Sequence, residues 1–434
     1  MALKQLFVPA LVLAALLAAC GTQGAAQPTP AAPAPTEASV GAATALPSAP
    51  PTNLPAATVT PLPVALPTAP PAGVGVLPRA LYILLSGQLH RIEPDGSTRT
   101  QITYEVPFRS DVVAVTDFAV SPADGSLVYT VQRAGSPVLV RSGPDGENPA
   151  PLYDDATVGV SDPLFTPDGG FVAVRLVAPF DQQASFQSGL YLLPIDGGEP
   201  QLLVADEPNS SPETPAFGHA PAAFSPDGAR LLSYRFSLNV ELCDLGVVSV
   251  PDGTAIALQV PPVREQERVS TCGPAAWSPD SSAIYYTPIR IGAPGGNSAI
   301  WRADPATGES LSLTPQTENT PFTLYAFPGV VADGSLRAFV AEADTMPAPF
   351  ADQPAPLDSA MARIDPADGT ASELRAPLSE TPMQVLWDGA GGGAVALLFP
   401  AVGDASLLWL PADGGEPVLL LDATTDLTAF EWAP

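Results

Sequence analysis

Short apolar segments alternate with acidic, glycine-containing turns along most of the chain. In FAVSPADGSLVYTV (118–131) and AAFSPDGARLLSYR (222–235), an apolar run leads into a turn and a second apolar run follows. Alternating apolar positions rich in β-branched and aromatic residues favour strands, and Asp-Gly pairs favour tight turns between antiparallel strands. No segment has a sustained helical period. The pattern therefore predicts an all-β protein.

The strand-and-turn pattern is an internal repeat. The segments LYLLPIDGGEPQLLVAD (190–206) and LLWLPADGGEPVLLLDA (407–423) agree closely enough to indicate duplication. Four strands in each unit, at a period of about 45 to 59 residues, are typical of a β-propeller. The second turn of the unit recurs seven times, at Asp95-Gly96, Asp145-Gly146, Asp196-Gly197, Asp252-Gly253, Thr307-Gly308, Asp368-Gly369 and Asp413-Gly414.

The first turn of the unit carries a family resemblance. Its Ser/Thr-Pro-Asp-Gly motif resembles the WD40-like repeats of the TolB propeller and of the propeller in prolyl-oligopeptidase-type peptidases. The resemblance covers residues 79–434 and implies the fold, while propellers host many unrelated functions. Those peptidases have a separate hydrolase domain with a Gly-x-Ser-x-Gly motif, which does not occur here. TolB has a folded domain before its propeller, where this chain has a proline-rich segment.

The two ends of the repeat region complement each other. The first unit (80–103) lacks a leading strand, and the terminal LTAFEWAP (427–434) supplies a leading strand with nothing after it. Pairing them would make a composite blade that closes the ring and removes exposed sheet edges. This arrangement predicts a seven-bladed propeller. A six-bladed ring, in which the last strand stays unpaired, is the alternative.

The N-terminal segment predicts export and anchoring. Residues 1–19 read as a signal peptide whose apolar run is too short for a transmembrane helix. The sequence Leu17-Ala18-Ala19-Cys20 resembles a bacterial lipobox, which implies acylation of Cys20 with palmitate-type chains; an ordinary signal peptide is the alternative. Residues 20–78, rich in Ala, Pro and Thr, predict a disordered linker because they cannot bury enough surface. The expected location is therefore extracytoplasmic, with a lipid anchor in the cell membrane or envelope.

The net charge limits the classes of partner, and the cysteines predict a disulfide. The formal net charge of −28 opposes binding to nucleic acid, and we expect a monomer. Once Cys20 is acylated, Cys243 and Cys272 are the remaining thiols. Export places them where disulfides persist, so the sequence predicts a Cys243–Cys272 bond, with two separate buried thiols as the alternative.

Strand direction sorts the loops onto two faces. Both acidic turns of each unit must lie on one face, and the longer, variable connections must lie on the other, which we call the long-loop face. Long loops on a rigid scaffold commonly carry recognition, and Arg and aromatic residues dominate interfaces. The candidate binding residues there are Phe180, Phe186, His219, Arg264, Arg268, Arg290 and Phe350.

The inventory of reactive groups is small. The chain has two histidines, which excludes multi-histidine metal sites, and no recognisable catalytic motif. No cofactor is expected: the acidic stretch DDATVGVSD (154–162) does not form a spaced ligand loop comparable to an EF-hand, and a structural Ca²⁺ is kept only as an alternative. The sequence thus favours a non-catalytic scaffold that binds an unidentified envelope or extracellular protein. Two alternatives stay open: a hydrolase or lyase acting in the propeller funnel, and a lipoprotein that binds sugars or peptides.

Overall fold

The computed structural model describes residues 75–109, 112–178, 186–207, 216–237, 243–259, 268–291, 299–315, 322–343, 358–378, 380–400, 405–422 and 426–434. These residues belong to one compact unit. They form strands and turns and contain no helix. The predicted signal peptide, Cys20 and nearly all of the predicted linker lie outside the described residues.

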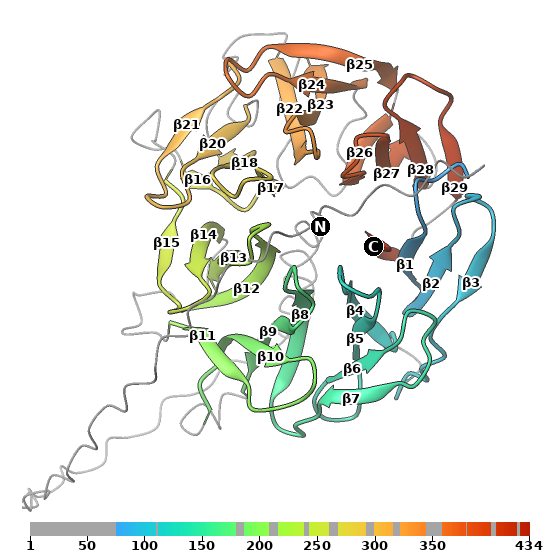
Figure 1. Cartoon of the computed structure of the whole chain (residues 1–434), viewed down its shortest axis with the longest axis vertical. Helices are drawn as coiled ribbons and strands as arrows, with labels where there is room; N and C mark the ends of the chain where they lie inside the picture. The colour runs from blue at the N-terminus through green and yellow to red at the C-terminus, as the bar shows by residue number, and fades with distance from the viewer. Residues whose placement is uncertain are drawn as a thin grey trace, which may run out of the picture. The chain divides into compact units, whose positions relative to one another are not determined.

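Seven four-stranded antiparallel sheets form the blades, arranged as a ring in Figure 1. Blade 1 contains β4 (Val115–Val120), β5 (Leu127–Val131), β6 (Val138–Ser142) and β7 (Ala150–Tyr153). Blade 2 contains β8 (Gly159–Phe165), β9 (Phe171–Val177), β10 (Gly189–Pro194) and β11 (Gln201–Ala205). Blade 3 contains β12 (Phe217–Phe224), β13 (Arg230–Ser237), β14 (Cys243–Ser249) and β15 (Ala255–Ala257). In each of these blades the first strand lies nearest the centre of the ring.

The remaining blades follow the same order. Blade 4 contains β17 (Ala275–Trp277), β18 (Ile284–Tyr286), β20 (Trp301–Ala303) and β21 (Ser310–Ser312). Blade 5 contains β22 (Phe322–Val330), β23 (Leu336–Ala343), β24 (Ser359–Ile364) and β25 (Ala371–Leu378). Blade 6 contains β26 (Glu380–Trp387), β27 (Gly393–Pro400), β28 (Ser406–Pro411) and β29 (Val418–Leu421). Blade 7 contains β30 (Leu427–Trp432), β1 (Leu81–Leu85), β2 (Gln88–Ile92) and β3 (Arg99–Gln101).

The predicted composite blade is confirmed. The C-terminal strand β30 pairs antiparallel with β1, with Trp432 opposite Leu81 and Phe430 opposite Ile83. The backbone N–H of Ala433 also donates to the carbonyl of Ala80 at 2.9 Å. Strands from both ends of the repeat region therefore close the ring, and the seven-bladed prediction is right where the six-bladed alternative is not.

Local chemistry explains the turns. After the first strand of blade 3, the Ser225 hydroxyl donates to Asp227 Oδ1 at 2.5 Å, and the same carboxylate accepts the N–H of Ala229 at 3.0 Å. The second turn of this blade needs glycine at Gly253, where φ is +70° and an added Cβ would lie 2.2 Å from the carbonyl oxygen of Leu203. The repeated Asp-Gly pairs thus fix turn geometry and let the turn of one blade approach its neighbour.

Blades pack on one another through apolar faces, and a recurrent tryptophan links some of them. The indole N–H of Trp277 donates to the Ala223 carbonyl at 3.1 Å, and that of Trp387 donates to Phe327 at 2.9 Å. At the closing blade, the indole of Trp432 donates to the Trp387 carbonyl at 3.1 Å. Each hydrogen bond joins the first strands of adjacent blades, and each indole side chain is buried between those two blades.

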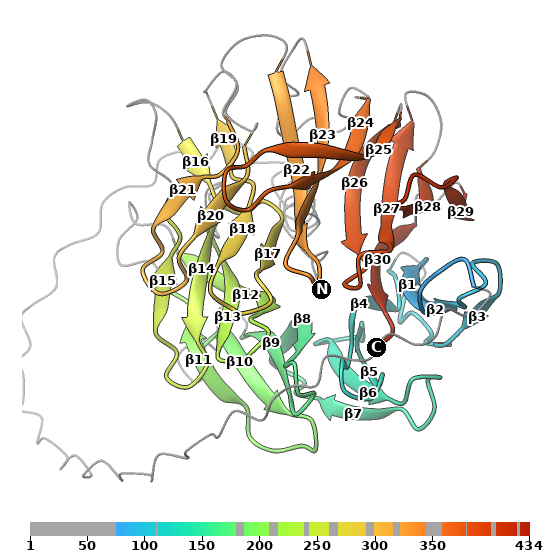
Figure 2. The same cartoon turned by 45° about the horizontal axis from the view of Figure 1, so that its top comes forward.

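One element was not anticipated. A two-stranded ribbon of β16 (Arg268–Ser270) and β19 (Ile289–Ile291) extends from blade 4. Figure 2 shows it above β18 and β20. Both segments were predicted to be loops, because strands of three residues, RVS and IRI, give almost no alternating apolar pattern.

Candidate functional site

The structure describes four of the seven predicted binding residues: Phe186, His219, Arg268 and Arg290. Phe180, Arg264 and Phe350 lie outside the described residues. Arg268 and Arg290 belong to the paired strands β16 and β19, so their backbones are neighbours in one ribbon. The ring of Phe186 stacks on Tyr191 with centroids 5.6 Å apart.

His219 lies in a strand, although the sequence analysis placed it at the end of a loop. It is the third residue of β12, at the start of blade 3, and it is 5% exposed. In the register of this sheet His219 lies opposite Arg235 of β13, which lies opposite Asp244 of β14. One row of three polar residues therefore runs across the blade at the end where the long loops begin.

Blade 2 supplies an ion pair beneath this row. Arg175 of β9 donates from Nη1 and Nη2 to the two carboxylate oxygens of Asp206, at 2.9 and 2.8 Å. Arg175 Nη1 also donates to the carbonyl oxygen of His219 at 2.8 Å, and Asp206 accepts the backbone N–H of His219 at 3.0 Å. The guanidinium lies 4.9 Å from the ring centre of Phe236. The pair therefore fixes the His219 backbone across the interface of two blades.

Gly218 makes that approach possible. A Cβ added at Gly218 would lie 2.8 Å from both terminal nitrogens of Arg175. Any side chain at this position would therefore displace the guanidinium.

Glu207 and Asp244 form the solvent-facing edge of the cluster, and Arg235 contacts both. Arg235 donates from Nε and Nη2 to the Glu207 carboxylate at 2.7 and 2.8 Å. Arg235 Nη1 lies 3.9 Å from Asp244 Oδ2. The side chains of Glu207 and Asp244 are 49% and 39% exposed, so both carboxyl groups can meet a molecule from solution. The Arg235 guanidinium also lies 3.5 Å from the ring centre of Phe217.

The environments of the two carboxyl groups shift their pKa values in opposite directions. The hydrogen bond from Arg235 lowers the pKa of Glu207, and the nearby His219 adds to this effect. Burial raises the pKa of Asp244, against the opposing charge of Arg235. These directions oppose the ordinary order, in which aspartate is the stronger acid, and they favour Glu207 as a base and Asp244 as an acid.

His219 lies behind Glu207. Its Nε2 is 3.7 Å from Glu207 Oε1, and its Nδ1 is buried with no hydrogen-bond partner among the described residues. Burial lowers the pKa of His219, with Arg235 and Arg175 acting in the same direction and Asp206 and Glu207 opposing them. The imidazole is therefore held neutral at neutral pH, beside a carboxylate that it can orient.

We call these residues the His219 cluster: Arg175, Asp206, Glu207, His219, Arg235 and Asp244. Of these, only His219 was predicted from the sequence. The usable signal was a charged residue within an apolar strand, as in FVAVRLV (171–177) and RLLSYRFS (230–237). Lys, Arg, Asp and Glu are seldom fully buried unless paired.

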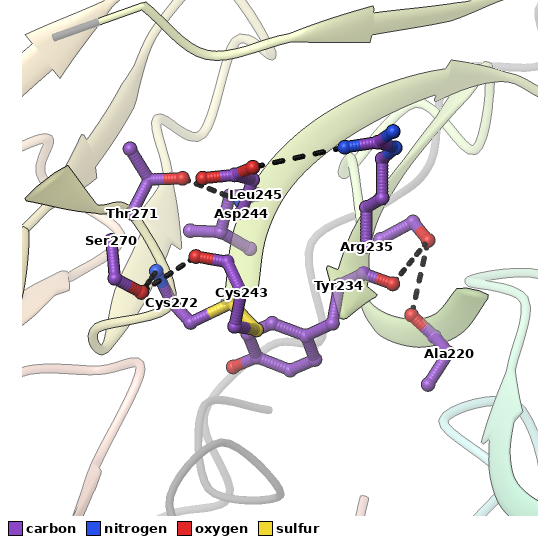
Figure 3. Close-up of a disulfide and its surroundings, with 10 residues drawn as sticks. Ala220, Tyr234, Arg235, Cys243, Asp244, Leu245, Ser270, Thr271 and Cys272 are labelled. Carbon is purple, nitrogen blue, oxygen red and sulfur yellow. Dashed lines mark hydrogen bonds and ion pairs between the residues drawn. A yellow bond between two sulfur atoms is a disulfide. The ribbon is translucent and has the colours of Figure 1, made fainter. Parts of the chain in front are cut away.

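The predicted disulfide lies beside the cluster, since Cys243 directly precedes Asp244 at the start of β14. Cys243 and Cys272 are bonded, with Cα atoms 5.6 Å apart, and they join blade 3 to the segment before β17. Ser270 Oγ donates to the Cys243 carbonyl at 2.6 Å, and Thr271 Oγ1 accepts the Leu245 N–H at 2.5 Å. Figure 3 shows the Tyr234 ring beside the sulfur atoms, and Asp244 directed toward Arg235. The bond is consistent with an extracytoplasmic location, because disulfides persist in oxidising compartments.

In the part of the chain that the structure describes, no three His, Cys, Asp or Glu side chains gather closely enough to hold a metal ion. The same residues include no helix with the length and apolarity needed to span a membrane. The calcium expectation stays a prediction without a located site.

Comparison with solved structures finds this fold in peptidases. The chain is similar to a puromycin-hydrolysing peptidase from Mycobacterium tuberculosis, at 16% identity and a TM-score of 0.51, over 79% of this chain and 50% of that one. It is also similar to a puromycin hydrolase, at 16% identity and a TM-score of 0.53, over 82% and 53% of the two chains. The chain thus spans about half the length of these two proteins.

TolB from Acinetobacter baumannii is also similar, at 18% identity and a TM-score of 0.40, over 80% of this chain and 79% of that one. The β-propeller fold predicted from the Pro-Asp-Gly repeat is confirmed by the seven four-stranded sheets. No protein-family model matches the chain, and no curated protein matches it.

These comparisons correct the functional prediction. The expectation of a non-catalytic scaffold, and with it the expectation that the protein is not an enzyme, is wrong as the leading interpretation. The same propeller fold occurs in peptidases, so the fold does not favour a non-catalytic protein over an enzyme. The error came from the missing Gly-x-Ser-x-Gly motif. A motif search does not detect side chains that distant strands bring together.

Proposed function

We propose that this protein is an extracytoplasmic hydrolase or lyase that acts on a saccharide or peptide at the His219 cluster. The observation that carries the proposal is the pair of exposed carboxyl groups, Glu207 and Asp244, whose pKa values are shifted in opposite directions around Arg235. General acid–base catalysis needs one group that accepts a proton and one that donates a proton at the same pH.

The roles follow from the pKa shifts. Glu207 stays ionised to lower pH than an ordinary glutamate and acts as the base, taking a proton from water or from a substrate carbon. Asp244 stays protonated to higher pH than an ordinary aspartate and acts as the acid, giving its proton to the leaving group. Both side chains are partly exposed to solvent.

The remaining members of the cluster position these two groups. Arg235 holds the Glu207 carboxylate with two hydrogen bonds, and His219 packs behind it. Arg175 and Asp206 hold His219 from blade 2. Residues locked by neighbours in this way keep a site in its productive geometry.

The peptidase neighbours add support of a different kind. Two solved proteins with this fold are a puromycin-hydrolysing peptidase and a puromycin hydrolase, so a hydrolytic role is a reasonable extension to this chain. Export, the lipid anchor and the linker are part of the same proposal. Residues 1–19 would direct export, Cys20 would carry the lipid, and residues 20–78 would be the linker to the propeller at residues 79–434. That the protein is monomeric, and that it binds no nucleic acid, stay predictions.

A substrate screen tests the proposal. The full-length protein would be incubated with chromogenic aminoacyl, ester and glycoside substrates and with uronate oligosaccharides. We expect turnover of at least one class and its loss in Glu207→Gln. The matched control is Glu93→Gln, because Glu93 also accepts a hydrogen bond from an arginine, Arg91, but lies in blade 7. Turnover that survives unchanged in Glu207→Gln, or no turnover of any class, would contradict the proposal.

A further inference from the structure

The first residues of β14, which carry Asp244, extend beyond the strand that completes their sheet. The last strand of the blade, β15, pairs only with residues 246–248 of β14. Beyond that point the N–H of Leu258 donates to the carbonyl of Leu245 at 2.9 Å. The outer edge of β14 at residues 243–245 therefore needs further hydrogen-bond partners from elsewhere, because buried backbone groups are nearly always paired.

A threonine completes the same edge in two other blades. In blade 7, Thr103 Oγ1 accepts the N–H of Leu89 at 2.8 Å. In blade 4, Thr314 Oγ1 accepts the N–H of Ile300 at 2.8 Å. Each threonine is the second residue after the fourth strand of its own blade. The second residue after β15 is Gln259, so blade 3 has no threonine at this position.

The segment that leads into blade 4 supplies the missing hydroxyl group. Thr271 is 3% exposed, and its Oγ1 accepts the N–H of Leu245 at 2.5 Å. Ser270 Oγ donates to the carbonyl of Cys243 at 2.6 Å. Figure 3 shows both contacts beside Asp244. The two chain neighbours of Asp244 are thus held by hydroxyl groups from one segment.

Asp244 lies between this segment and Arg235. Its side chain is 39% exposed, and Arg235 Nη1, on β13, is 3.9 Å from its Oδ2. Glu207 accepts hydrogen bonds from the same guanidinium. The hydroxyl groups, the disulfide and the Ala-Ile-Ala sequence of β15 bring no further charge. Burial raises the pKa of Asp244 against the charge of Arg235, so the access of water to the start of β14 controls how readily Asp244 loses its proton.

We propose that residues 270–272 form a clamp that positions Asp244 as the proton donor of the site. Ser270 and Thr271 hold the backbone on either side of Asp244, and the Cys243–Cys272 disulfide ties the clamp to the first residue of β14. The inference rests on the proposed function, in which Asp244 is the acid. Thr271 contacts no reacting atom, so it is a positioning residue.

Thr271→Val tests the clamp, because valine keeps the shape of threonine and removes the oxygen that accepts the Leu245 N–H. We expect the start of β14 to loosen and admit water, so that Asp244 loses its proton at a lower pH than in the wild type. Carbon-13 NMR of the full-length protein, labelled at the aspartate carboxyl carbons, measures this titration, and the Asp244 signal is the one absent from Asp244→Asn. Thr271→Ser keeps the acceptor and should keep the wild-type midpoint. The matched control is Thr314→Val, which removes the same kind of hydrogen bond in blade 4 and should leave the midpoint of Asp244 unchanged.

Three results would overturn the proposal: a midpoint unchanged in Thr271→Val, one that falls as far in Thr271→Ser, or one that falls as far in Thr314→Val. Should Thr271→Val fail to fold, the wild type is titrated after treatment with a dithiol, which reduces Cys243 and Cys272 to two thiols and is itself oxidised to a disulfide. A lower midpoint of Asp244 then supports the clamp, and an unchanged midpoint contradicts it.

The NMR titration needs no substrate, so the clamp and the proposed function can fail separately. On a substrate that the protein turns over, the alkaline limb of kcat/KM should move to lower pH in Thr271→Val together with the NMR midpoint. A midpoint that falls while the limb stays in place would show that residues 270–272 hold Asp244 but that Asp244 is not the acid, and would overturn the role proposed for the clamp.

Discussion

Arg175 and Asp206 form a two-armed ion pair across the interface of blades 2 and 3, with N–O distances of 2.9 and 2.8 Å. Both partners also bond to the backbone of His219. This pair supports the proposed acid–base site although it does not belong to the solvent-facing edge. Its burial makes its removal more damaging than removal of the exposed pair above it.

Arg175→Met should lower the free energy of unfolding by about 3 to 5 kcal/mol, because it leaves a buried carboxylate without its partner. Arg235→Met should cost about 1 kcal/mol, since the Glu207 carboxylate it pairs with is about half exposed and solvent screens the pair. Urea unfolding of the two variants measures the difference. Equal costs would show that the Arg175 pair is not the main support of this interface.

Gly218→Ala should destabilise the protein by about 1 to 3 kcal/mol, because the new methyl group would overlap the Arg175 guanidinium. The control is Gly159→Ala in β8, where the nearest atom to an added Cβ lies at 3.7 Å and no clash arises. Thermal unfolding compares them. If both variants unfold at the same temperature, the close approach at Gly218 is not required.

The free energy of unfolding should fall on mild acidification, in part because His219 binds a proton more readily in the unfolded state. Folding lowers the pKa of His219 below its ordinary value of 6.5. Above about pH 6.5 the residue is neutral in both states and contributes nothing to the pH dependence. Below it, the unfolded state takes up a proton first, so the free energy of unfolding falls by at most about 1.4 kcal/mol per pH unit until the folded pKa is reached.

Urea unfolding between pH 7.5 and 5 would measure this slope, and His219→Gln should reduce it. Burial also lowers the pKa of His90, so His90→Gln serves as the matched control and should leave the His219 contribution in place. A slope unchanged by His219→Gln would mean that its pKa is not lowered by folding.

The disulfide should stabilise blade 3 against blade 4. Its cysteines are 29 residues apart, and replacing both by serine should cost about 3 to 4 kcal/mol in the loop-entropy model. A reducing agent should lower the Tm of the wild type and leave that of the double variant unchanged. A wild type that is insensitive to full reduction would contradict this.

The sequence predicted much of the scaffold and little of the site, for a physical reason. The blades follow from local features: Asp-Gly turns, apolar alternation, and a terminal LTAFEWAP that matches the missing strand of the first unit. The His219 cluster depends on register and on contacts between blades. Arg175 and Asp206 are 31 residues apart, and Arg235 meets Glu207 across 28 residues. Neither contact can be derived from a repeat pattern.

Two further features of the structure were not predicted from the sequence, for similar reasons. His219 was assigned to a loop because the segment before it is polar, yet β12 begins at Phe217 and buries it. The ribbon of β16 and β19 was missed because three-residue strands give almost no periodic signal. Buried charges inside apolar strands are the feature that would have directed attention to the cluster.

The central claim is that Glu207 and Asp244 are the base and the acid of one site. The most direct test is the pH dependence of kcat/KM on the substrate found by the screen, for the wild type, Glu207→Gln, Asp244→Asn and His219→Gln. We predict a bell-shaped profile with its optimum on the acid side of neutrality, rising through the pKa of Glu207 and falling through that of Asp244. Glu207→Gln should lose the acid limb and Asp244→Asn the alkaline limb, each with a large loss of rate. His219→Gln should move the acid limb to higher pH, because His219 helps to lower the pKa of Glu207. A profile whose two limbs persist in both carboxylate variants would contradict the account.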